Sequence, residues 1–187
     1  MLDTGLKTQL STYLEKITGA LTLEVAVDAS EQSTKLLVLA NEIAELSTLI
    51  TVKEVTSGHE RTPSLSVIGE KNQSQITFAG LPMGHEFTSL VLALLHAGEH
   101  PVKLPEDDIN AIKSLQGELK FHTYVSLSCQ SCPVVVQALN MMAALNPNIS
   151  HTMIDGAVFQ DEVKQNNILS VPAVYLNNEP FAQGRVT

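Results

Sequence analysis

Residues 124–133 read Tyr124-Val-Ser-Leu-Ser-Cys129-Gln-Ser-Cys132-Pro133, and these are the only two cysteines among 187 residues. A run of β-forming residues leads into the pair, and a run with helical periodicity follows it. Unpaired backbone N–H groups and the helix dipole favour a negative charge at a helix N-terminus, so the first thiol is expected to ionise near neutral pH. The pattern predicts that the Cys129 thiolate attacks a disulfide and that Cys132 resolves the mixed disulfide.

Two other interpretations of the cysteine pair, a zinc site and a structural disulfide, have weaker support in the sequence. A structural zinc site needs about four ligands, but the six histidines are scattered along the chain and form no spaced pair. A purely structural disulfide would gain little chain entropy by closing so short a loop. A Cys-x-x-Cys between a strand and a helix is instead typical of a thioredoxin-like redox centre, and no metal site is expected.

Composition narrows the class of protein. The net charge is −9, and hydrophobic residues make up 44% of the chain, without a tryptophan. No basic stripe appears, so neither nucleic acid nor an anionic membrane is an expected partner. The N-terminus lacks the pattern of a signal peptide, and no apolar run approaches the ~20 residues that span a bilayer. These features predict a cytoplasmic protein. In the reducing cytoplasm a disulfide is usually transient and catalytic.

The second half of the chain reads as β-α-β-α-β-β. Strands are expected at 119–127, 149–154, 172–176 and 180–183, with helices at 130–145 and 159–167. The last two strands form a hairpin around residues 177–179. A thioredoxin-like unit needs one further helix, which is missing after residue 183.

The first half repeats this order. Strands are expected at 21–27, 49–54, 62–68 and 75–79, and helices at 32–46 and 83–97, after an N-terminal amphipathic helix at 3–17. The middle helix is missing between residues 54 and 61. Thr62-Pro63 corresponds to Val171-Pro172, and Ala29 replaces Cys129.

The predicted fold is therefore α/β, with two tandem thioredoxin-like units, each a mixed four-stranded sheet with flanking helices. The expected divisions are a redox-inactive unit at 1–102, a linker helix at 103–118, and a unit with the dithiol at 119–187, truncated at its C-terminus and lacking its last helix. Pro105-Glu-Asp-Asp108 begins the linker helix well, because proline and acids suit the first turn.

Further residues are candidates for the site. The bond between Val171 and Pro172 is expected to be cis and to face the dithiol, leaving strand backbone groups free for a partner's chain; otherwise Pro172 is an ordinary edge-strand proline. Glu86 is either an acid at a helix N-terminus or a partly buried carboxyl that takes the proton of the resolving thiol. His85 and His122 are expected at the surface. Gln130 and Ser131 bring no cation, which favours a reducing disulfide.

Several runs together resemble one family. They are Met1-Leu-Asp-Thr, Lys7-Thr-Gln-Leu, Gly84-His-Glu-Phe-Thr-Ser-Leu-Val-Leu-Ala-Leu-Leu95, Ser126-Leu-Ser-Cys129, Val136-Gln-Ala-Leu-Asn140, Ile154-Asp-Gly156, Val171-Pro-Ala-Val174 and Gln183-Gly-Arg185. Over essentially its whole length, the chain resembles the N-terminal tandem thioredoxin-like region of the alkyl hydroperoxide reductase flavoprotein, the F subunit of that enzyme.

The resemblance implies that electrons run from NADH to FAD, then to a dithiol of the flavoprotein part, and then to the dithiol at Cys129 and Cys132. That dithiol would reduce the disulfide of a partner peroxiredoxin. The resemblance also places Glu86 near the pair. Family members often carry His-Asn between the cysteines, where this chain has Gln-Ser; the difference concerns the redox potential and the thiolate pKa.

No dinucleotide fingerprint of the G-x-G-x-x-G type occurs in the sequence. We therefore expect a fragment of a longer protein, with FAD and NADH bound in the missing C-terminal part and no cofactor in this one. The leading interpretation is a dithiol–disulfide oxidoreductase. Its alternatives are a general protein-disulfide or glutathione-mixed-disulfide reductase of thioredoxin or glutaredoxin type, and a docking module in which the cysteines are incidental.

Overall fold

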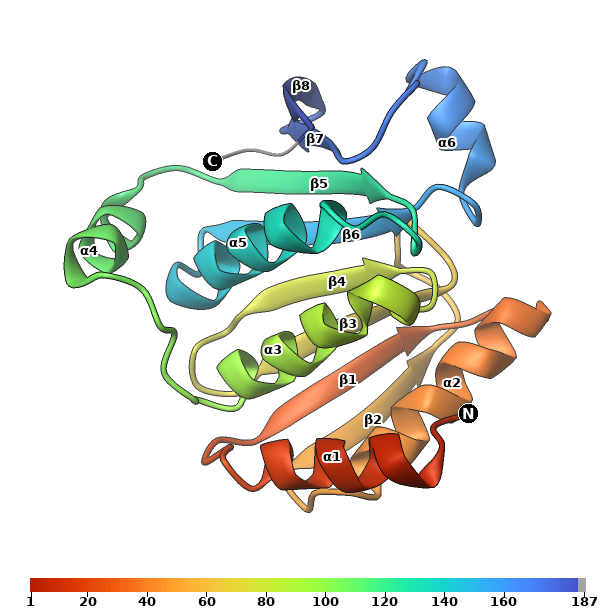
Figure 1. Ribbon diagram of the computed structural model, residues 1–187, viewed down its shortest axis with the longest axis vertical. Helices are drawn as coiled ribbons and strands as arrows, with labels where there is room; N and C mark the ends of the chain where they lie inside the picture. Colours follow the sequence, from red (N-terminus) through yellow and green to blue (C-terminus); the bar gives the residue numbers. More distant parts are fainter. Residues whose placement is uncertain (185–187) are drawn as a thin grey trace.

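One continuous mixed sheet runs through the part of the chain that this computed structural model describes, residues 1–184 (Figure 1). Its strand order is β2-β1-β3-β4-β6-β5-β7-β8. The strands are β1 (Leu21–Ala26), β2 (Ile50–Val55), β3 (Ser64–Gly69), β4 (Gln75–Ala79), β5 (Leu119–Val125), β6 (Ile149–Asp155), β7 (Ala173–Leu176) and β8 (Glu179–Gln183). The helices are α1 (Thr4–Leu14), α2 (Glu31–Ala44), the 3-10 helix η1 (Gly84–Glu86), α3 (Phe87–Ala97), α4 (Glu106–Ser114), α5 (Cys132–Leu145) and α6 (Gln160–Gln165).

The expected tandem arrangement is confirmed. In each half a parallel strand pair is extended by two antiparallel strands, β2-β1-β3-β4 in the first and β6-β5-β7-β8 in the second. A middle helix is absent from the first half, as predicted, and within residues 1–184 no helix follows β8. The expected element ends differ from the observed ones by a few residues, mostly at caps, where helices fray. Arg185, part of the resemblance, lies outside the described residues.

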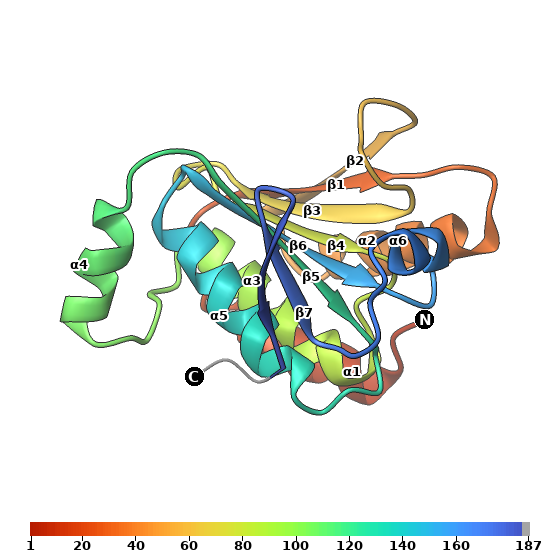
Figure 2. The ribbon, with the colours of Figure 1, turned by 90° about the horizontal axis from the view of Figure 1, so that it is seen from above.

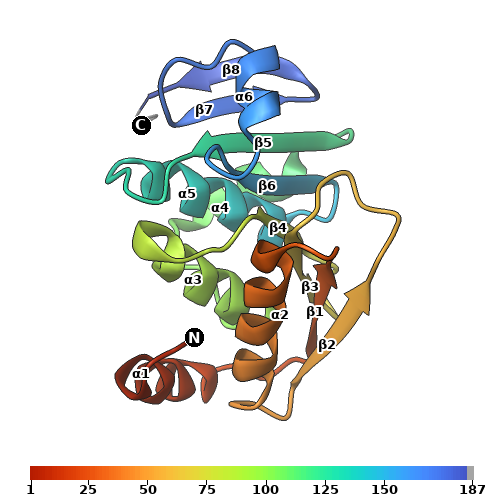
Figure 3. The ribbon, with the colours of Figure 1, turned by 90° about the vertical axis from the view of Figure 1, so that its right-hand side faces the viewer.

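The two halves join edge to edge, which the sequence did not predict. Strand β4 of the first half pairs in parallel with β6 of the second, from Gln75 opposite Ser150 to Ala79 opposite Ile154. Figure 3 shows the strands of both halves following one another in a single sheet. The two units thus share one hydrogen-bonded sheet, and their expected boundaries at residues 102 and 118 stay a prediction.

Helices from both halves cover the same face of the sheet. Apolar residues alternate along β1, β3 and β4 and point toward α2, α3 and α5, so that one core extends across both halves. Figure 2 shows α1, α3 and α5 on this face. Helix α3 packs directly along α5, and Gln137 of α5 donates a hydrogen bond to Ser89 of α3 at 3.2 Å. The helix that carries Cys132 is therefore braced by a helix of the other half.

The opposite face is largely polar. It carries hydroxyl pairs such as Ser66 and Thr77, whose oxygens lie 2.9 Å apart. Helix α6 covers a small apolar cluster there, around Tyr124 and Ile154. His122 lies on this face beside Tyr175, its partner on β7, and its ring stacks on Tyr175. Its predicted surface position is wrong: His122 is 4% exposed, because strand pairing brings the Tyr175 ring over it.

An ion pair links the halves across this polar face. Arg61, in the loop that stands where the first half lacks a helix, donates from Nε and Nη2 to the carboxylate of Glu162 on α6, at 2.9 and 3.0 Å. The Tyr124 hydroxyl donates to the same carboxylate at 2.9 Å. Burial works against ionisation of Glu162, but these hydrogen bonds outweigh it and lower its pKa. The geometry is bidentate, the strong form of such a pair.

Replacing Arg61 by methionine tests this link. The change leaves the Glu162 carboxylate half-buried with Tyr124 as its remaining donor, so we expect the free energy of unfolding to fall by about 2 kcal/mol in urea titrations at pH 7. This is less than for a fully buried pair, because the Glu162 side chain is 27% exposed. Lys35→Met, which breaks an exposed pair with Glu31, should cost less than about 0.5 kcal/mol. Equal losses in the two variants would contradict the link.

Candidate redox site

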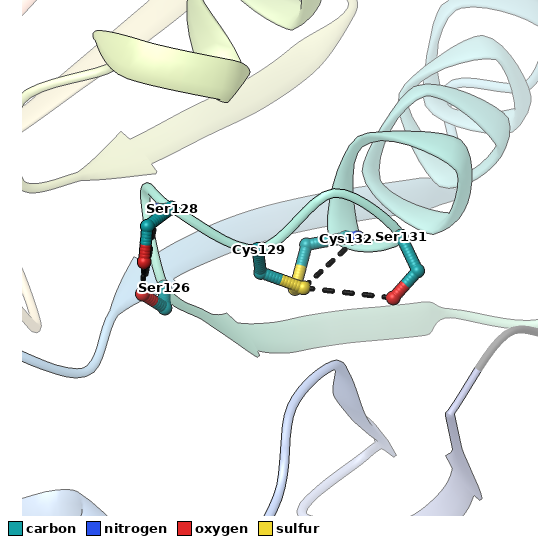
Figure 4. The surroundings of a disulfide bond; sticks show 5 residues. All are labelled: Ser126, Ser128, Cys129, Ser131 and Cys132. Atoms are coloured by element: carbon teal, nitrogen blue, oxygen red, sulfur yellow. Dashed lines mark hydrogen bonds between the residues drawn. A yellow bond between two sulfur atoms is a disulfide. The ribbon is translucent and has the colours of Figure 1, made fainter.

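Cys129 and Cys132 form a disulfide between the end of β5 and the start of α5 (Figure 4). Their Cα atoms are 5.5 Å apart. Cys132 is 0% exposed, whereas the Cys129 side chain is partly exposed. Because only Cys129 meets solvent, it is the sulfur that a partner can reach. The pairing is confirmed; the roles of attacking and resolving sulfur stay a prediction.

The start of α5 lies against Cys129, as the sequence predicted. The backbone N–H of Cys132 donates to Cys129 Sγ at 3.2 Å, and the Ser131 hydroxyl oxygen lies 3.6 Å from the same sulfur. Pro133 occupies the first turn of the helix, where its missing N–H costs nothing. A thiolate formed at Cys129 would therefore meet a backbone donor and the positive end of the helix dipole.

Glu86 is fully buried, at 0% exposure, and neither carboxylate oxygen has a hydrogen-bond partner within residues 1–184. Burial favours the neutral form and raises the pKa of Glu86 to about 7, an effect that the nearby Ser89 hydroxyl offsets only in part. The sequence indicated partial burial at most. The neighbouring His85 is exposed, as predicted.

The segment that carries Glu86 is held against the loop before Cys129. The backbone N–H of His85 donates to the Leu127 carbonyl at 3.0 Å. Gly84 has φ +59°, and a Cβ at this position would lie 2.9 Å from the same carbonyl oxygen. Only glycine accommodates both the backbone conformation and this close approach. The fold thus brings the first half to the redox loop, and the proton-transfer role of Glu86 stays a prediction.

The Val171–Pro172 peptide bond is cis, as predicted, and the bond between Thr62 and Pro63 is cis as well. That Pro172 faces the dithiol stays a prediction. Ala173 pairs antiparallel with Tyr124, so the residues before Ala173 run alongside the loop that leads from β5 to Cys129. The Pro172 carbonyl accepts from Gly184. Within residues 1–184, Val171 makes no backbone hydrogen bond. The role of Val171 and Pro172 in binding a partner's chain stays a prediction.

Three serine hydroxyls lie in the loop that carries the disulfide, and one of them contacts a sulfur. Ser126 and Ser128 lie 3.0 Å apart through their hydroxyl oxygens, and Ser131 approaches the sulfur (Figure 4). From the sequence, Ser131 was considered only as a residue without a charge. Its position between the two cysteines was the one signal of a contact with sulfur, because a residue of this turn lies close to both sulfurs.

Neither a metal centre nor a membrane span is found in the described part of the chain. Residues 1–184 hold no group of three or more His, Cys, Asp and Glu side chains that could bind a metal ion. Among the helices of the same residues, none is both long and apolar enough to cross a bilayer.

Comparison with known proteins places this geometry in context. Residues 119–187 match the model of the family described as "Thioredoxin domain". The chain is 54% identical over 187 residues to the F subunit of alkyl hydroperoxide reductase from Pseudomonas aeruginosa, and 49% identical over 187 residues to that from Escherichia coli K12. Both alignments cover 100% of this chain but 36% of the relative, so the chain spans about a third of their length.

A solved structure is similar over its whole length. It is the NTD_N/C domain of alkyl hydroperoxide reductase AhpF from Enterococcus faecalis, which is 31% identical in sequence and has a TM-score of 0.90. The alignment covers 100% of this chain and 96% of that one. The fold described above is therefore the fold of that domain.

The buried carboxyl of Glu86 predicts a pH-dependent stability. Its folded pKa of about 7 lies above the ordinary value of 4.5, so the native state binds the extra proton and loses stability as the pH rises through that window. The full effect is roughly 3 kcal/mol. We expect Glu86→Gln and the parent chain to have similar unfolding free energies in urea near pH 4.5, and the variant to gain relative stability up to pH 7.5.

Glu45→Gln removes an exposed carboxylate at the C-terminal end of α2 and serves as the matched control. Its stability difference from the parent chain gives the background effect of replacing an exposed glutamate by glutamine. A stability difference between Glu86→Gln and the parent that stays constant from pH 4.5 to 7.5 would mean that Glu86 does not titrate in this range.

Proposed function

Because this chain belongs to the family of the F subunit of alkyl hydroperoxide reductase, we propose that it is the thiol–disulfide oxidoreductase module that reduces the disulfide of a partner peroxiredoxin. The observation that carries the proposal is the asymmetry of the disulfide. Cys129 is partly exposed at the N-terminus of α5, with a backbone donor on its sulfur, while Cys132 is fully buried behind it. One sulfur is placed to exchange with a partner and the other to complete the exchange.

The exchange follows from this placement. In the reduced module, the Cys129 thiolate attacks one sulfur of the partner's disulfide, and the other partner sulfur leaves as a thiolate. A mixed disulfide then joins Cys129 to the partner. Cys132, after losing its proton, attacks Cys129 Sγ, restores the intramolecular disulfide and releases the second partner thiol. Two electrons have passed from the module to the partner.

Glu86 is the proposed acceptor of the Cys132 proton. Its segment is held to the redox loop through the hydrogen bond from His85 to Leu127. A carboxyl with a pKa of about 7 exchanges protons readily at neutral pH, which suits a general acid–base role. Such a role gives the cysteine-free first unit, residues 1–102, a function in the reaction, because it supplies this group to the dithiol unit at 119–187.

Val171 and Pro172 are the proposed partner-binding residues. The segment runs beside the loop that carries Cys129, and the backbone of Val171 has no partner within residues 1–184. An extended peptide segment of the partner, next to its reactive cysteine, would pair with the backbone of Val171 as an added strand. Residues 126–134 carry no charged side chain, so hydrogen bonds and apolar contacts would dominate near the sulfur.

The electron supply belongs to the remaining part of the longer protein. The relatives are nearly three times as long as this chain. We propose that their additional length holds the FAD and NADH sites of a flavoprotein, which reduces the Cys129–Cys132 disulfide. The sequence favours the cytoplasm as the compartment, where a reducing environment keeps such a disulfide in turnover.

A trapping experiment tests the proposal. With Cys132→Ser the resolving sulfur is gone, so Cys129 should form a stable mixed disulfide with an oxidised peroxiredoxin of the alkyl hydroperoxide reductase system. Non-reducing electrophoresis and mass spectrometry should show a one-to-one adduct that dithiothreitol cleaves. In a separate variant that keeps Cys132, Cys129→Ser should abolish measurable reduction of the peroxiredoxin.

Two results would contradict the proposal. Turnover retained by Cys129→Ser would mean that the cysteines are incidental and that the module only docks a partner. Reduction of insulin or of a glutathione mixed disulfide as fast as the peroxiredoxin would indicate a general disulfide reductase. Cys129→Ser combined with Cys132→Ser is the control that should form no adduct.

A further inference from the structure

Two hydrogen-bond donors converge on Cys129 Sγ, and one of them is a side chain. Figure 4 shows both contacts: the backbone N–H of Cys132 at 3.2 Å and the Ser131 hydroxyl at 3.6 Å. The sulfur of a disulfide carries no hydrogen, so the hydroxyl must be the donor in the second contact. A distance of 3.6 Å is ordinary for a bond to sulfur, which is a larger atom than oxygen.

The Ser131 hydroxyl is not used in the way that its position would suggest. Ser131 is the N-cap residue of α5, where a serine usually accepts a hydrogen bond from a backbone N–H of the first turn. It makes no such capping bond. Ser30, the N-cap of α2, does make one, accepting from Ser33 at 3.2 Å. At α5 the hydroxyl is directed to the sulfur instead.

The surroundings make this donor important. Residues 126–134 contain no lysine, arginine or histidine, so no cation within the loop stabilises a charged sulfur. Within residues 1–184, the contacts of these two donors fall on Cys129 Sγ and not on Cys132 Sγ. Hydrogen bonds to an ionised acceptor are stronger than those to a neutral one. The Ser131 contact should therefore strengthen when the disulfide opens and Cys129 becomes a thiolate.

We propose that Ser131 is a positioning residue for the redox step, whose hydroxyl holds and stabilises the Cys129 thiolate. When a dithiol reductant opens the disulfide, the S–S bond breaks, Cys129 keeps a lone pair as thiolate, and Cys132 receives a proton as thiol. The reductant becomes a disulfide and one proton is released. By stabilising the reduced form, Ser131 makes the disulfide easier to reduce. The inference rests on the proposed exchange at Cys129, but not on the identity of the partner.

Ser131→Ala and Ser131→Gly test the inference, because both remove the hydroxyl and glycine remains a good N-cap residue. Alkylation of Cys129 by iodoacetamide in the reduced protein, followed by mass spectrometry against pH, reports its pKa. We expect that pKa to rise by about one unit, the effect of losing one hydrogen bond to a charged group. The equilibrium with dithiothreitol should shift up to about tenfold toward the protein disulfide.

Two further variants separate the hydroxyl from a general effect of the turn. Ser131→Thr keeps the hydroxyl, so the Cys129 pKa and the equilibrium with dithiothreitol should stay at the values of the parent chain. Gln130→Ala changes the other residue between the cysteines, which is exposed, and should leave both unchanged. Unchanged values in both hydroxyl-free variants would overturn the inference, as would an equal shift in Gln130→Ala. These measurements use small thiols only, so the inference can hold even if the peroxiredoxin proves to be the wrong partner.

Discussion

The hydrogen bond from the Cys132 backbone N–H to Cys129 Sγ is the contact on which the site depends. It exists because α5 begins at Cys132, directly after the turn that carries Cys129. Free N–H groups and the dipole of the helix then point at one sulfur and not at the other. Burial adds to this difference, since Cys132 is 0% exposed and Cys129 is partly exposed. Exposure and the helix dipole therefore distinguish the same sulfur, which supports the proposal that Cys129 contacts a partner.

The first half of the chain has no cysteine, but it contributes to the structure of the redox site. Its helix α3 packs along α5, and its segment at Gly84 and His85 meets the redox loop at Leu127. Glu86, the residue after His85, is buried beside this contact. The parallel pairing of β4 with β6 holds both halves in one sheet, and the Arg61–Glu162 pair joins them on the opposite face. These contacts connect the half that carries Glu86 to the half that carries the redox loop.

The neutral character of the loop gives backbone and hydroxyl groups a large part in its chemistry. A cation between the cysteines would act at longer range and would be screened by salt. The Cys132 N–H and the Ser131 hydroxyl act only at contact distance, and both are built into the turn that begins α5. The redox properties of the dithiol are thereby coupled to the residue at which one helix starts.

Several features could be predicted from the sequence because they are local. The Cys-x-x-Cys motif and each helical or strand period lie within a short stretch, and the repeated order of elements is read from these local periods. Even the cis bond before Pro172 followed from the combination of a proline with the dithiol motif. The burial of His122 and Glu86, the direction of the Ser131 hydroxyl, and the edge pairing of β4 with β6 could not be predicted in this way. The burial of His122 depends on Tyr175, which lies far from it in the chain, and the Ser131 contact depends on the backbone angles of one turn. The placement of Glu86 and the pairing of β4 with β6 depend on how the two halves pack together.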